Sequence, residues 1–564
     1  MKKISCIILT LGSLLGIFGL VKSSQAATIN AASCSQVDVQ AAIDAARDGD
    51  AVTVPAGVCT WIIATVNIPD GKNIILQGAG KDVTTINGTY NYTLLELNAT
   101  SSRITGFTFT EGTIDVHGQG FRIDHCKLTS AAAGGIAAAM VTAISWSNDV
   151  TCYGLIDHCE THNARLVHAG GPSLFAKYRW AEPNNLGDQN ALYVEDCTVD
   201  GSVMTINSTD QNYGGAIVFR YNSIDNSQNQ VHSLQAGDTR GSKRWEFYGN
   251  TYTAEADSQY HWVAQFIRGG TGVSFNNKWS GFYNDGNILL DNVRSENVDW
   301  SKDDCGRCDG SSLWDGNTPV QDYTTLDVIG LGTHKGANNA PILTDSSKSW
   351  IVNDFVGCWI YNLGDGSKGK ITTNTATTVN GTLSGGSRNN WNTNDNYKLS
   401  CGYPCRDGIG QGQDEFLWVT PNVPPIPAQS KQPAYIWGNW NGAASVYAYN
   451  RGDTNLVKYH FFQNEDFYNY TGSFDGTSGG GCGTLVSRPS SCTAGVAYWA
   501  TNQSCSNLTG MVGPNPPTPI SGTLYKCTST NTWTPYYTPY TYPHPLQGLI
   551  DTTPPASPTG LTVN

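Results

Sequence analysis

Three short segments end alike and carry polar side chains that could bind and cleave an acidic sugar. They are Arg165-Leu-Val-His168-Ala-Gly-Gly, His232-Ser-Leu-Gln235-Ala-Gly and Gln265-Phe-Ile-Arg268-Gly-Gly, with Met204-Thr-Ile-Asn207 in the equivalent place between the first two. If the segments stack, one polar row forms from His168, Asn207, Gln235 and Arg268, with Arg165, His232 and Gln265 beside it. An arginine can neutralise a carboxylate, and a histidine can move a proton near neutral pH. We therefore predict a groove in which the catalytic candidates are Arg268, His232 and His168.

A basic cluster of Arg240, Lys243 and Arg244 flanks the same region. Such a cluster alone is usually a solvated loop, and the polar row could equally be the outward side chains of a solvated sheet. The candidate substrate-binding residues are Arg165, Asn207, Gln235, Gln265, Arg240 and Arg244.

One short phrase recurs between Arg103 and Gly281 and predicts the scaffold that positions these residues. Its copies are RITGFTF, RIDHCKL, LIDHCET, YVEDCTV, VFRYNSI, EFYGNTY and VSFNNKW. Their fifth residues, here called the bend column, are Phe107, Cys126, Cys159, Cys197, Asn222, Asn250 and Asn277. The steps of 19 to 38 residues are typical of repeat architectures, in which each unit buries its apolar face against its neighbours. Asn at a bend can bond the backbone of adjacent units.

Residues 34–60 predict an amphipathic helix followed by a strand. Val39, Ala42, Ile43 and Ala46 fall on one helical stripe, and Asp48-Gly49-Asp50 ends the helix. A stack of strands exposes an unpaired edge at its end, and a helix placed there would cap it.

These motifs resemble those of the pectin-lyase-like right-handed parallel β-helix proteins over roughly residues 34–300. The resemblance is carried by the cap helix, the Asn column, the two Ile-Asp-His-Cys strands, and the stretches Gly49-Asp-Ala-Val-Thr-Val-Pro-Ala-Gly57 and Ile75-Leu-Gln-Gly-Ala-Gly80. It implies an all-β fold, a right-handed parallel β-helix with an N-terminal capping helix. It does not fix a reaction.

Within that family, the region around Arg268 loosely resembles alginate and chondroitin lyases. Those enzymes carry an Arg in an Arg-x-Gly turn, which Arg268 matches, and a Lys base on an earlier strand. Gln235 stands where that Lys should be, and an amide cannot abstract a proton. His232 or His168 would have to replace it. The Gly-His-Gly and Arg-x-Lys motifs of the pectin hydrolases are absent from the sequence.

Composition divides the chain into five parts. Residues 1–26 resemble a secretory signal peptide, with Lys2 and Lys3 before an apolar run and Ser24-Gln25-Ala26 at its end. A membrane anchor is the alternative. The other parts are a β-helix over 27–340, an inserted small β module over 341–400, remaining β-helix coils and a Cys/Tyr-rich cap over 401–545, and a tail over 546–564 that resembles the start of a fibronectin-type-III domain.

The cysteines fit an oxidising compartment. Adjacent pairs predict three local disulfides: Cys34–Cys59, Cys482–Cys492 and Cys505–Cys527. The Cys305/Cys308 and Cys401/Cys405 pairs indicate two tight bridges or, alternatively, one zinc site. The three cysteines of the bend column are predicted to pack as small apolar side chains.

Two acidic patterns could be mistaken for sites. The loop with Asp299, Asp303, Asp304, Asp309 and Asp315 has enough oxygens for Ca²⁺, but Asp-Gly turns explain much of it. Asp124-His125 and Asp157-His158 look like catalytic dyads, yet they recur inside the repeat phrase and predict structural turns. No cofactor is predicted, with calcium as the alternative.

Charge limits the partners. Removal of residues 1–26 would leave 30 Lys and Arg against 46 Asp and Glu, which argues against nucleic acid and anionic membranes as partners. No later stretch is apolar enough to span a membrane. We predict a secreted β-helix protein that binds an extracellular polysaccharide, with lyase-type β-elimination of a uronic-acid glycan as the reaction hypothesis. The alternative is a non-catalytic structural or adhesive protein of the cell surface or matrix.

Overall fold

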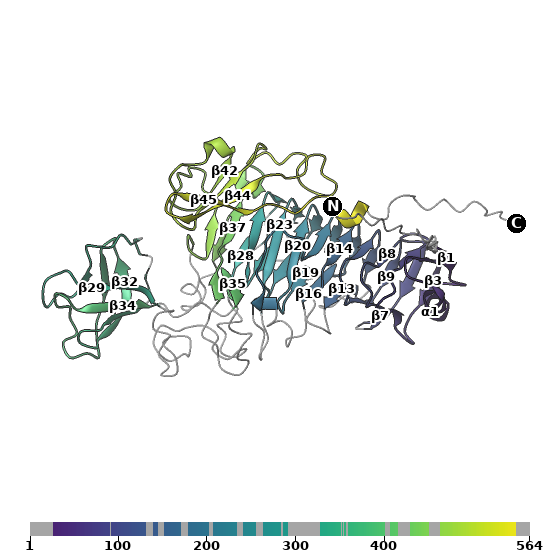
Figure 1. Cartoon of the computed structure of the whole chain (residues 1–564), viewed down its shortest axis with the longest axis horizontal. Coiled ribbons are helices and arrows are strands. Elements are labelled where there is room, and N and C mark those ends of the chain that lie inside the picture. Colours follow the sequence, from purple (N-terminus) through teal and green to yellow (C-terminus); the bar gives the residue numbers. More distant parts are fainter. Residues whose placement is uncertain are drawn as a thin grey trace, which may run out of the picture.

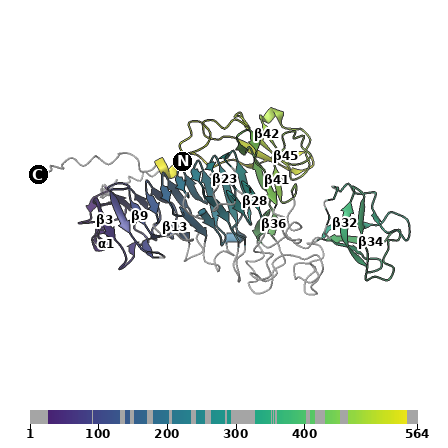
Figure 2. The ribbon, with the colours of Figure 1, turned by 180° about the vertical axis from the view of Figure 1, so that it is seen from behind.

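The computed structural model describes residues 26–90, 92–130, 139–144, 152–170, 179–201, 207–233, 241–254, 263–281, 283, 286–291, 328–350, 352–353, 355–356, 359–400, 407–414, 429–450 and 463–548. Most of the strands in these ranges stack into three long sheets, here called A, B and C, which run side by side along the molecule (Figure 1). Figure 2 shows the same stack from behind, with the C-terminal strands against one side of it.

Sheet A contains twelve strands, and each pairs in parallel with the next. In order they are β1 (Thr28–Asn30), β2 (Ala51–Val54), β5 (Ile75–Gly78), β8 (Arg103–Thr105), β11 (Phe121–Asp124), β14 (Gly154–Asp157), β17 (Leu192–Glu195), β20 (Ala216–Arg220), β23 (Arg244–Tyr248), β26 (Thr271–Phe275), β37 (Ala434–Trp437) and β41 (Phe467–Asn469). The pairing of β26 with β37 shows that the coils resume at Ala434 after an interruption that begins beyond β28 (Ile288–Leu290).

Sheets B and C complete each coil. Sheet B contains β3 (Gly57–Thr60), β6 (Thr84–Asn87), β9 (Thr108–Thr110), β12 (Lys127–Thr129), β15 (Glu160–His162), β18 (Thr198–Asp200), β21 (Ser223–Asp225), β24 (Thr251–Thr253), β27 (Lys278–Ser280), β38 (Trp440–Asn441) and β39 (Ala444–Ser445). Sheet C contains β4 (Val66–Ile68), β7 (Thr93–Leu97), β10 (Gly112–Val116), β13 (Ala139–Ile144), β16 (Val167–Gly170), β19 (Asn207–Gln211), β22 (Gln228–Val231), β25 (Gln265–Ile267), β28 (Ile288–Leu290) and β40 (Ala448–Asn450). The predicted all-β, parallel β-helix fold is confirmed.

Helix α1 (Gln36–Ala45) caps the first coil, as predicted. Ser35 begins it by accepting a hydrogen bond from the backbone N–H of Asp38. Val39, Ala42 and Ile43 are buried against the first strands. A disulfide between Cys34 and Cys59, also predicted, ties the helix to β3.

The asparagines of the bend column form a continuous ladder inside the coils. The Oδ1 of Asn250 accepts bonds from the backbone N (3.0 Å) and the Nδ2 (3.1 Å) of Asn222. In the same way, Asn277 Oδ1 accepts bonds from the backbone N and the Nδ2 of Asn250, and Asn439 Oδ1 accepts them from Asn277. In the earlier coils the place is filled by Cys126, Cys159 and Cys197, which are buried free thiols. The column therefore aligns as the sequence predicted.

A separate six-stranded sheet with its own core occupies residues 328–400. Its strands, in spatial order, are β29 (Val328–Thr333), β34 (Asn396–Ser400), β31 (Trp359–Asn362), β32 (Lys368–Asn374), β33 (Thr378–Gly381) and β30 (Leu343–Thr344). All its pairings are antiparallel. Leu343, Ile360, Trp391 and Leu399 are among its core residues.

The C-terminal part packs on the outer face of sheet A. It contains β42 (Gly480–Gly483), β43 (Ala497–Ala500), β44 (Thr523–Ser529), β45 (Thr532–Tyr537), the 3₁₀ turn η5 (Leu485–Ser487) and the short helix α4 (Pro545–Gly548). A two-stranded ribbon of β35 (Gln411–Asp414) and β36 (Gln429–Lys431) precedes it. Aromatic side chains of both parts share one core, including Phe275, Trp437 and Trp499. Two predicted disulfides were wrong, because Cys482 bonds Cys505 and Cys492 bonds Cys527.

Residues 538–548, here called the C-terminal segment, run back along sheet A and cover a series of buried ion pairs. Arg122 binds Asp157 through two bonds of 2.9 Å, and Arg220 binds Glu195. Backbone carbonyls of the C-terminal segment accept further bonds from both arginines. The segment therefore connects the outer faces of coils that are far apart along the stack.

Candidate functional site

The polar residues predicted to form a groove come from sheet C and from the turns at its end. His168 on β16 pairs with Asp210 on β19, which pairs with Gln230 on β22. Ala169, Gln211, Val231 and Ile267 form the next row, and their side chains lie inside the coil. The side chain of the residue after each of them points outward again. These following residues form a row of Gly170, Asn212, His232 and Arg268.

This register corrects the predicted row. His168 and Asn207 do not share a row, because His168 aligns with Asp210, three residues further on. Asn207 lies at the start of β19 and donates a hydrogen bond to Gln230. Arg268 and His232 are instead neighbours on successive coils, since Arg268 N bonds Val231 O and His232 N bonds Gln211 O.

Three side chains, Arg165, His168 and His232, meet around the buried carboxylate of Asp210. We call these four residues the polar cluster. Asp210 Oδ1 lies 2.6 Å from His232 Nε2, and Asp210 Oδ2 lies 3.1 Å from Arg165 Nη1. Burial acts to raise the pKa of Asp210, but the charges of His232 and Arg165 outweigh it and hold the pKa well below its usual value. Asp210 is therefore a fixed negative charge that orients the cations around it.

His168 has the properties of a neutral base at the edge of the cluster. Its Nε2 lies 3.1 Å from Asn212 Oδ1, which can only accept, so Nε2 carries the proton and the lone pair is on Nδ1. Burial lowers the pKa of His168, Asp210 opposes this effect, and Arg165 adds to it. His168 and Arg165 are half-buried, so both can be reached at the edge of the cluster.

Two of the predicted residues are placed less favourably for contact with a substrate. Arg268 is only 3% exposed, and its guanidinium lies 4.6 Å from the ring centroid of Phe266. Gln265 points into the coil, where it bonds the hydroxyls of Tyr252 and Ser274. Its predicted contact with a substrate is wrong, because its side chain faces the core.

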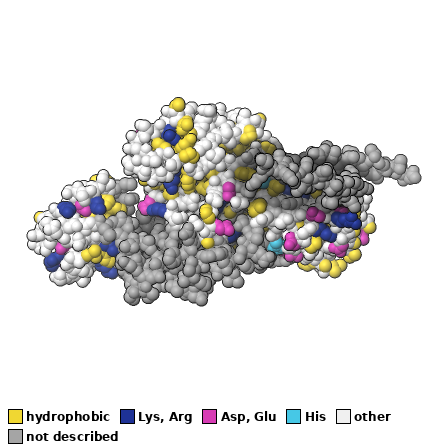
Figure 3. All heavy atoms as spheres, in the orientation of Figure 1, with side chains coloured by type: hydrophobic (Ala, Val, Ile, Leu, Met, Phe, Trp, Pro, Cys, Tyr) yellow, Lys and Arg dark blue, Asp and Glu magenta, His cyan; other side chains and the backbone are white. Residues whose placement is uncertain are grey.

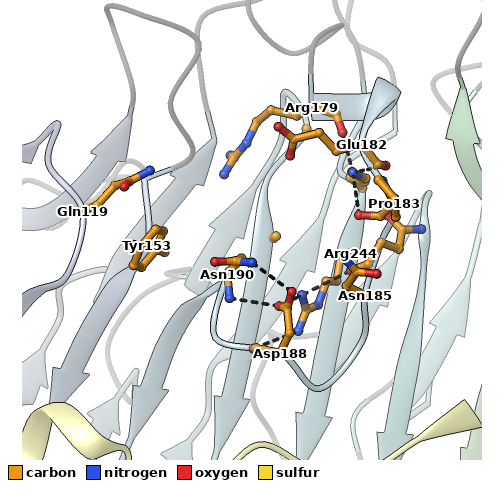
Figure 4. Close-up of a pocket in the computed structure, with 13 residues that line it drawn as sticks. Gln119, Tyr153, Arg179, Glu182, Pro183, Asn185, Asp188, Asn190 and Arg244 are labelled. Carbon is orange, nitrogen blue, oxygen red and sulfur yellow. Dashed lines mark hydrogen bonds and ion pairs between the residues drawn. The ribbon is translucent and has the colours of Figure 1, made fainter. Parts of the chain in front are cut away.

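A pocket of about 450 Å³ lies where sheet C turns into sheet A (Figure 4). Gln119 and Tyr153 lie on one side of this corner pocket, and Asn190 and Asp188 lie on the other. Arg179 points into it from the segment before β17. Gly214, two residues after Asn212, and Ala216, the first residue of β20, also line the pocket.

Arg244, predicted to bind substrate, lines the corner pocket but is held by protein partners. It is buried and bonds Glu246 and Asp188 at 2.6 Å each. Its neighbour Lys243 donates to backbone carbonyls of Arg179, Glu182 and Pro183. These two cations fasten the segment before β17 and so shape the pocket.

Several predictions fall outside the described residues, namely Gln235, Arg240, the acidic loop of residues 299–315 and the Cys305/Cys308 and Cys401/Cys405 pairs. Among the residues that the structure describes, no group of three or more His, Cys, Asp or Glu side chains could hold a metal ion. In the same part of the chain, no helix has the length and apolar character needed to cross a membrane.

The two Asp-His pairs occupy turns, as predicted. His125 and His158 have φ of 50° and 51°, and their rings stack with centroids 5.1 Å apart. Asp124 and Asp157 each bind an arginine as well as the neighbouring histidine. The two aspartates belong to the ion-pair series on sheet A, whereas the side chain of His125 is 55% exposed.

The chain matches no protein-family model and no curated protein. The solved structure of an alginate lyase from Paenibacillus sp. str. FPU-7 aligns with 46% of this chain and 97% of the lyase chain, at 15% identity and a TM-score of 0.23. A superposition this poor does not bear on the reaction of this chain. Membership of the pectin-lyase-like family stays a prediction.

Asp210 and Asn212 are the functional candidates that the sequence analysis missed. Asp210 lies in Ser208-Thr-Asp-Gln-Asn212, which has no strand-like alternation of apolar residues. The available signal was its place one coil after His168, which becomes visible only once the register is known.

Proposed function

We propose that this chain is an exported protein that binds an acidic extracellular polysaccharide and cleaves it by β-elimination at the polar cluster. The observation that carries the proposal is the arrangement of a neutral histidine and an arginine beside one buried carboxylate, on successive coils of sheet C. The three disulfides support export, because such bonds are typical of oxidising compartments.

Each step of the reaction has a residue suited to it. Arg165, at the half-buried edge of the cluster, would neutralise the carboxylate of a uronate and so acidify the proton on the adjacent carbon. His168 Nδ1 would take that proton. The electron pair forms the C4–C5 double bond, the C4–O4 bond breaks, and the departing oxygen takes a proton from water. His232 positions Asp210, which in turn orients Arg165.

The corner pocket would hold a neighbouring sugar of the same polymer. Its ring of Tyr153, its amides of Gln119 and Asn190 and its guanidinium of Arg179 are groups that recognise saccharides through stacking and hydrogen bonds. Gly214 of the pocket wall is two residues from Asn212, which contacts His168, so one polymer chain could reach both places.

Incubation with uronic-acid polymers tests the proposal. Alginate, polygalacturonate and glycosaminoglycans should each be tried, and cleavage of the correct one should raise ultraviolet absorbance through the unsaturated product. We expect His168→Ala to lower kcat/KM about 100-fold or more, as removal of a general base typically does. Arg165→Ala should lower it about 100-fold or more as well, because the charge that develops on the substrate carboxylate loses its cation.

His162→Ala is the matched control. His162 also pairs with an aspartate, Asp200, at 2.7 Å, but it is exposed on sheet B. The kcat/KM of the His162→Ala variant should equal that of the wild type. Absence of an unsaturated product from every polymer would instead favour a non-catalytic structural protein. Equal activity of the His168→Ala variant would rule out His168 as the base.

The pH dependence gives a second test. A base must be unprotonated, so activity falls as pH drops through the pKa of His168. Because that pKa is lowered, the acid limb of kcat/KM should have its midpoint below about pH 6.5, the usual value for histidine. Asp210→Asn removes a charge that raises this pKa, so the midpoint should move further down in any residual activity. A midpoint above pH 6.5 would rule out His168 as the base.

A further inference from the structure

One face of the small antiparallel sheet carries aromatic and lysine side chains in register. Trp359 and Tyr361 alternate with the core residue Ile360 on β31 and are both partly exposed, although part of Trp359 packs against that core. Lys370 pairs with Trp359, while Lys368 and Lys398 pair with Tyr361 from its two sides. These five residues are called the aromatic–lysine face.

The lysines of this face lie beside the aromatic rings. Lys368 Nζ is 5.3 Å from the ring centroid of Trp359, and Lys398 Nζ is 5.3 Å from that of Tyr361. At such distances the negative face of the ring attracts the ammonium group that lies over it. Trp359 and Tyr361 are half-buried and Lys370 is exposed, so part of the face is in contact with solvent.

The small sheet is basic in an otherwise acidic protein. Residues 328–400 contain six Lys and Arg, four Asp and no Glu, whereas the whole chain has a net charge of −13. Figure 3 shows several Lys and Arg side chains on the surface of this body. An anionic partner would therefore be attracted to this sheet and repelled by most of the remaining surface.

We propose that the aromatic–lysine face binds a linear polyuronate. Each sugar of such a polymer presents an apolar ring face, which suits Trp359 and Tyr361, and one carboxylate, which suits a lysine. Single-stranded nucleic acid combines stacking and charge similarly, but the disulfides favour a compartment in which glycans are the available linear polyanions. The site holds the polymer whether or not the polar cluster cleaves it.

Affinity electrophoresis of the full chain in native gels tests this site. Polygalacturonate in the gel should retard the wild type, whereas the neutral polymer dextran should not. Lys368→Ala/Lys370→Ala should raise the Kd for polygalacturonate about tenfold. Trp359→Ala should do at least the same, because the stacking of a flat ligand such as a nucleobase on one aromatic ring is typically a tenfold effect or more, and we expect a sugar ring to lose a similar contact.

Lys335→Ala is the matched control, since Lys335 is exposed in the same part of the chain and outside the face. It should bind as the wild type does. The His168→Ala variant should keep binding, and Lys368→Ala/Lys370→Ala should keep any cleavage of a short oligouronate, so the two sites fail separately. Unchanged binding in the double variant, equal retardation by dextran, or preference for oligothymidylate would overturn the proposal.

Discussion

Replacing Arg220 by methionine is expected to lower the free energy of unfolding by about 3–5 kcal/mol, the typical cost of removing one partner of a buried ion pair. Arg220 is fully buried, and its guanidinium bonds Glu195, the hydroxyl of Tyr248 and the carbonyls of Tyr540 and Thr541. Methionine fills similar volume but leaves the Glu195 carboxylate buried without its cation. Guanidinium denaturation at neutral pH measures the loss.

The loss should depend on pH in a defined direction. Burial is the largest effect on Glu195 and raises its pKa above the usual value despite Arg220. A buried carboxyl with a raised folded-state pKa destabilises the protein as pH rises, because it must then lose its proton inside the fold. The loss of unfolding free energy in Arg220→Met should therefore be smaller at about pH 4 than at about pH 8. Lys81→Met, at the exposed Lys81–Glu160 pair, is the control and should cost at most about 1 kcal/mol. Equal losses in both variants would show that the covered pair is dispensable.

Asn250→Ala is expected to lower the free energy of unfolding by about 1–3 kcal/mol. The side chain of Asn250 is fully buried, and its Oδ1 accepts from the backbone N and the Nδ2 of Asn222. The backbone N–H of Asn222 would lose its acceptor, at about 1–3 kcal/mol, whereas the Nδ2 of Asn222 would keep the carbonyls of Val194 and Arg220. The free energy of unfolding and the protection of the Asn222 amide against hydrogen exchange should both fall.

Asn250→Cys separates the role of hydrogen bonding from that of volume. Cys197 holds the equivalent place in an earlier coil, where its Sγ lies 3.4 Å from the backbone N of Cys159. The cysteine variant should therefore be clearly more stable than the alanine variant. If both lose the same stability, the ladder contributes through packing rather than through its hydrogen bonds.

The scaffold was predictable because its signal is repeated. Seven copies of one phrase mark the same bend, and each copy alternates so that residues such as Ile123, Val194 and Phe247 face the core. Agreement among copies compensates for the weakness of a single short strand as a signal.

The register of the site was not predictable, because the interior of these coils is partly polar. Gln211 lies inside and donates to the carbonyls of Gly215 and Arg244, and Asn229 bonds Ser208 and Thr209. Apolar alternation therefore does not distinguish inward from outward residues in β19, β22 and β25. The predicted row was aligned on the shared Ala-Gly and Gly-Gly endings of the segments. These endings follow the strands at different distances, so the alignment misplaced His168 by two residues relative to Arg268.

Disulfide pairing in the C-terminal part failed for a different reason. Four cysteines allow three pairings, and spacing alone does not choose among them. Parallel pairing of β42 with β43 and antiparallel pairing of β43 with β44 bring Cys492 next to Cys527, and leave Cys482 with Cys505.

The contact of Arg122 with the carbonyl of Gln547 joins residues 425 positions apart. A ribosome delivers β11 long before it delivers that carbonyl, so a nascent chain must keep the arginines of sheet A hydrated while most of the stack already exists. The C-terminal segment can therefore cover the arginines of sheet A only late, after synthesis has passed residue 547. Until then the newly made protein presents an unshielded row of charges and aromatic rings, and this is the stage at which a folding factor would have most to protect.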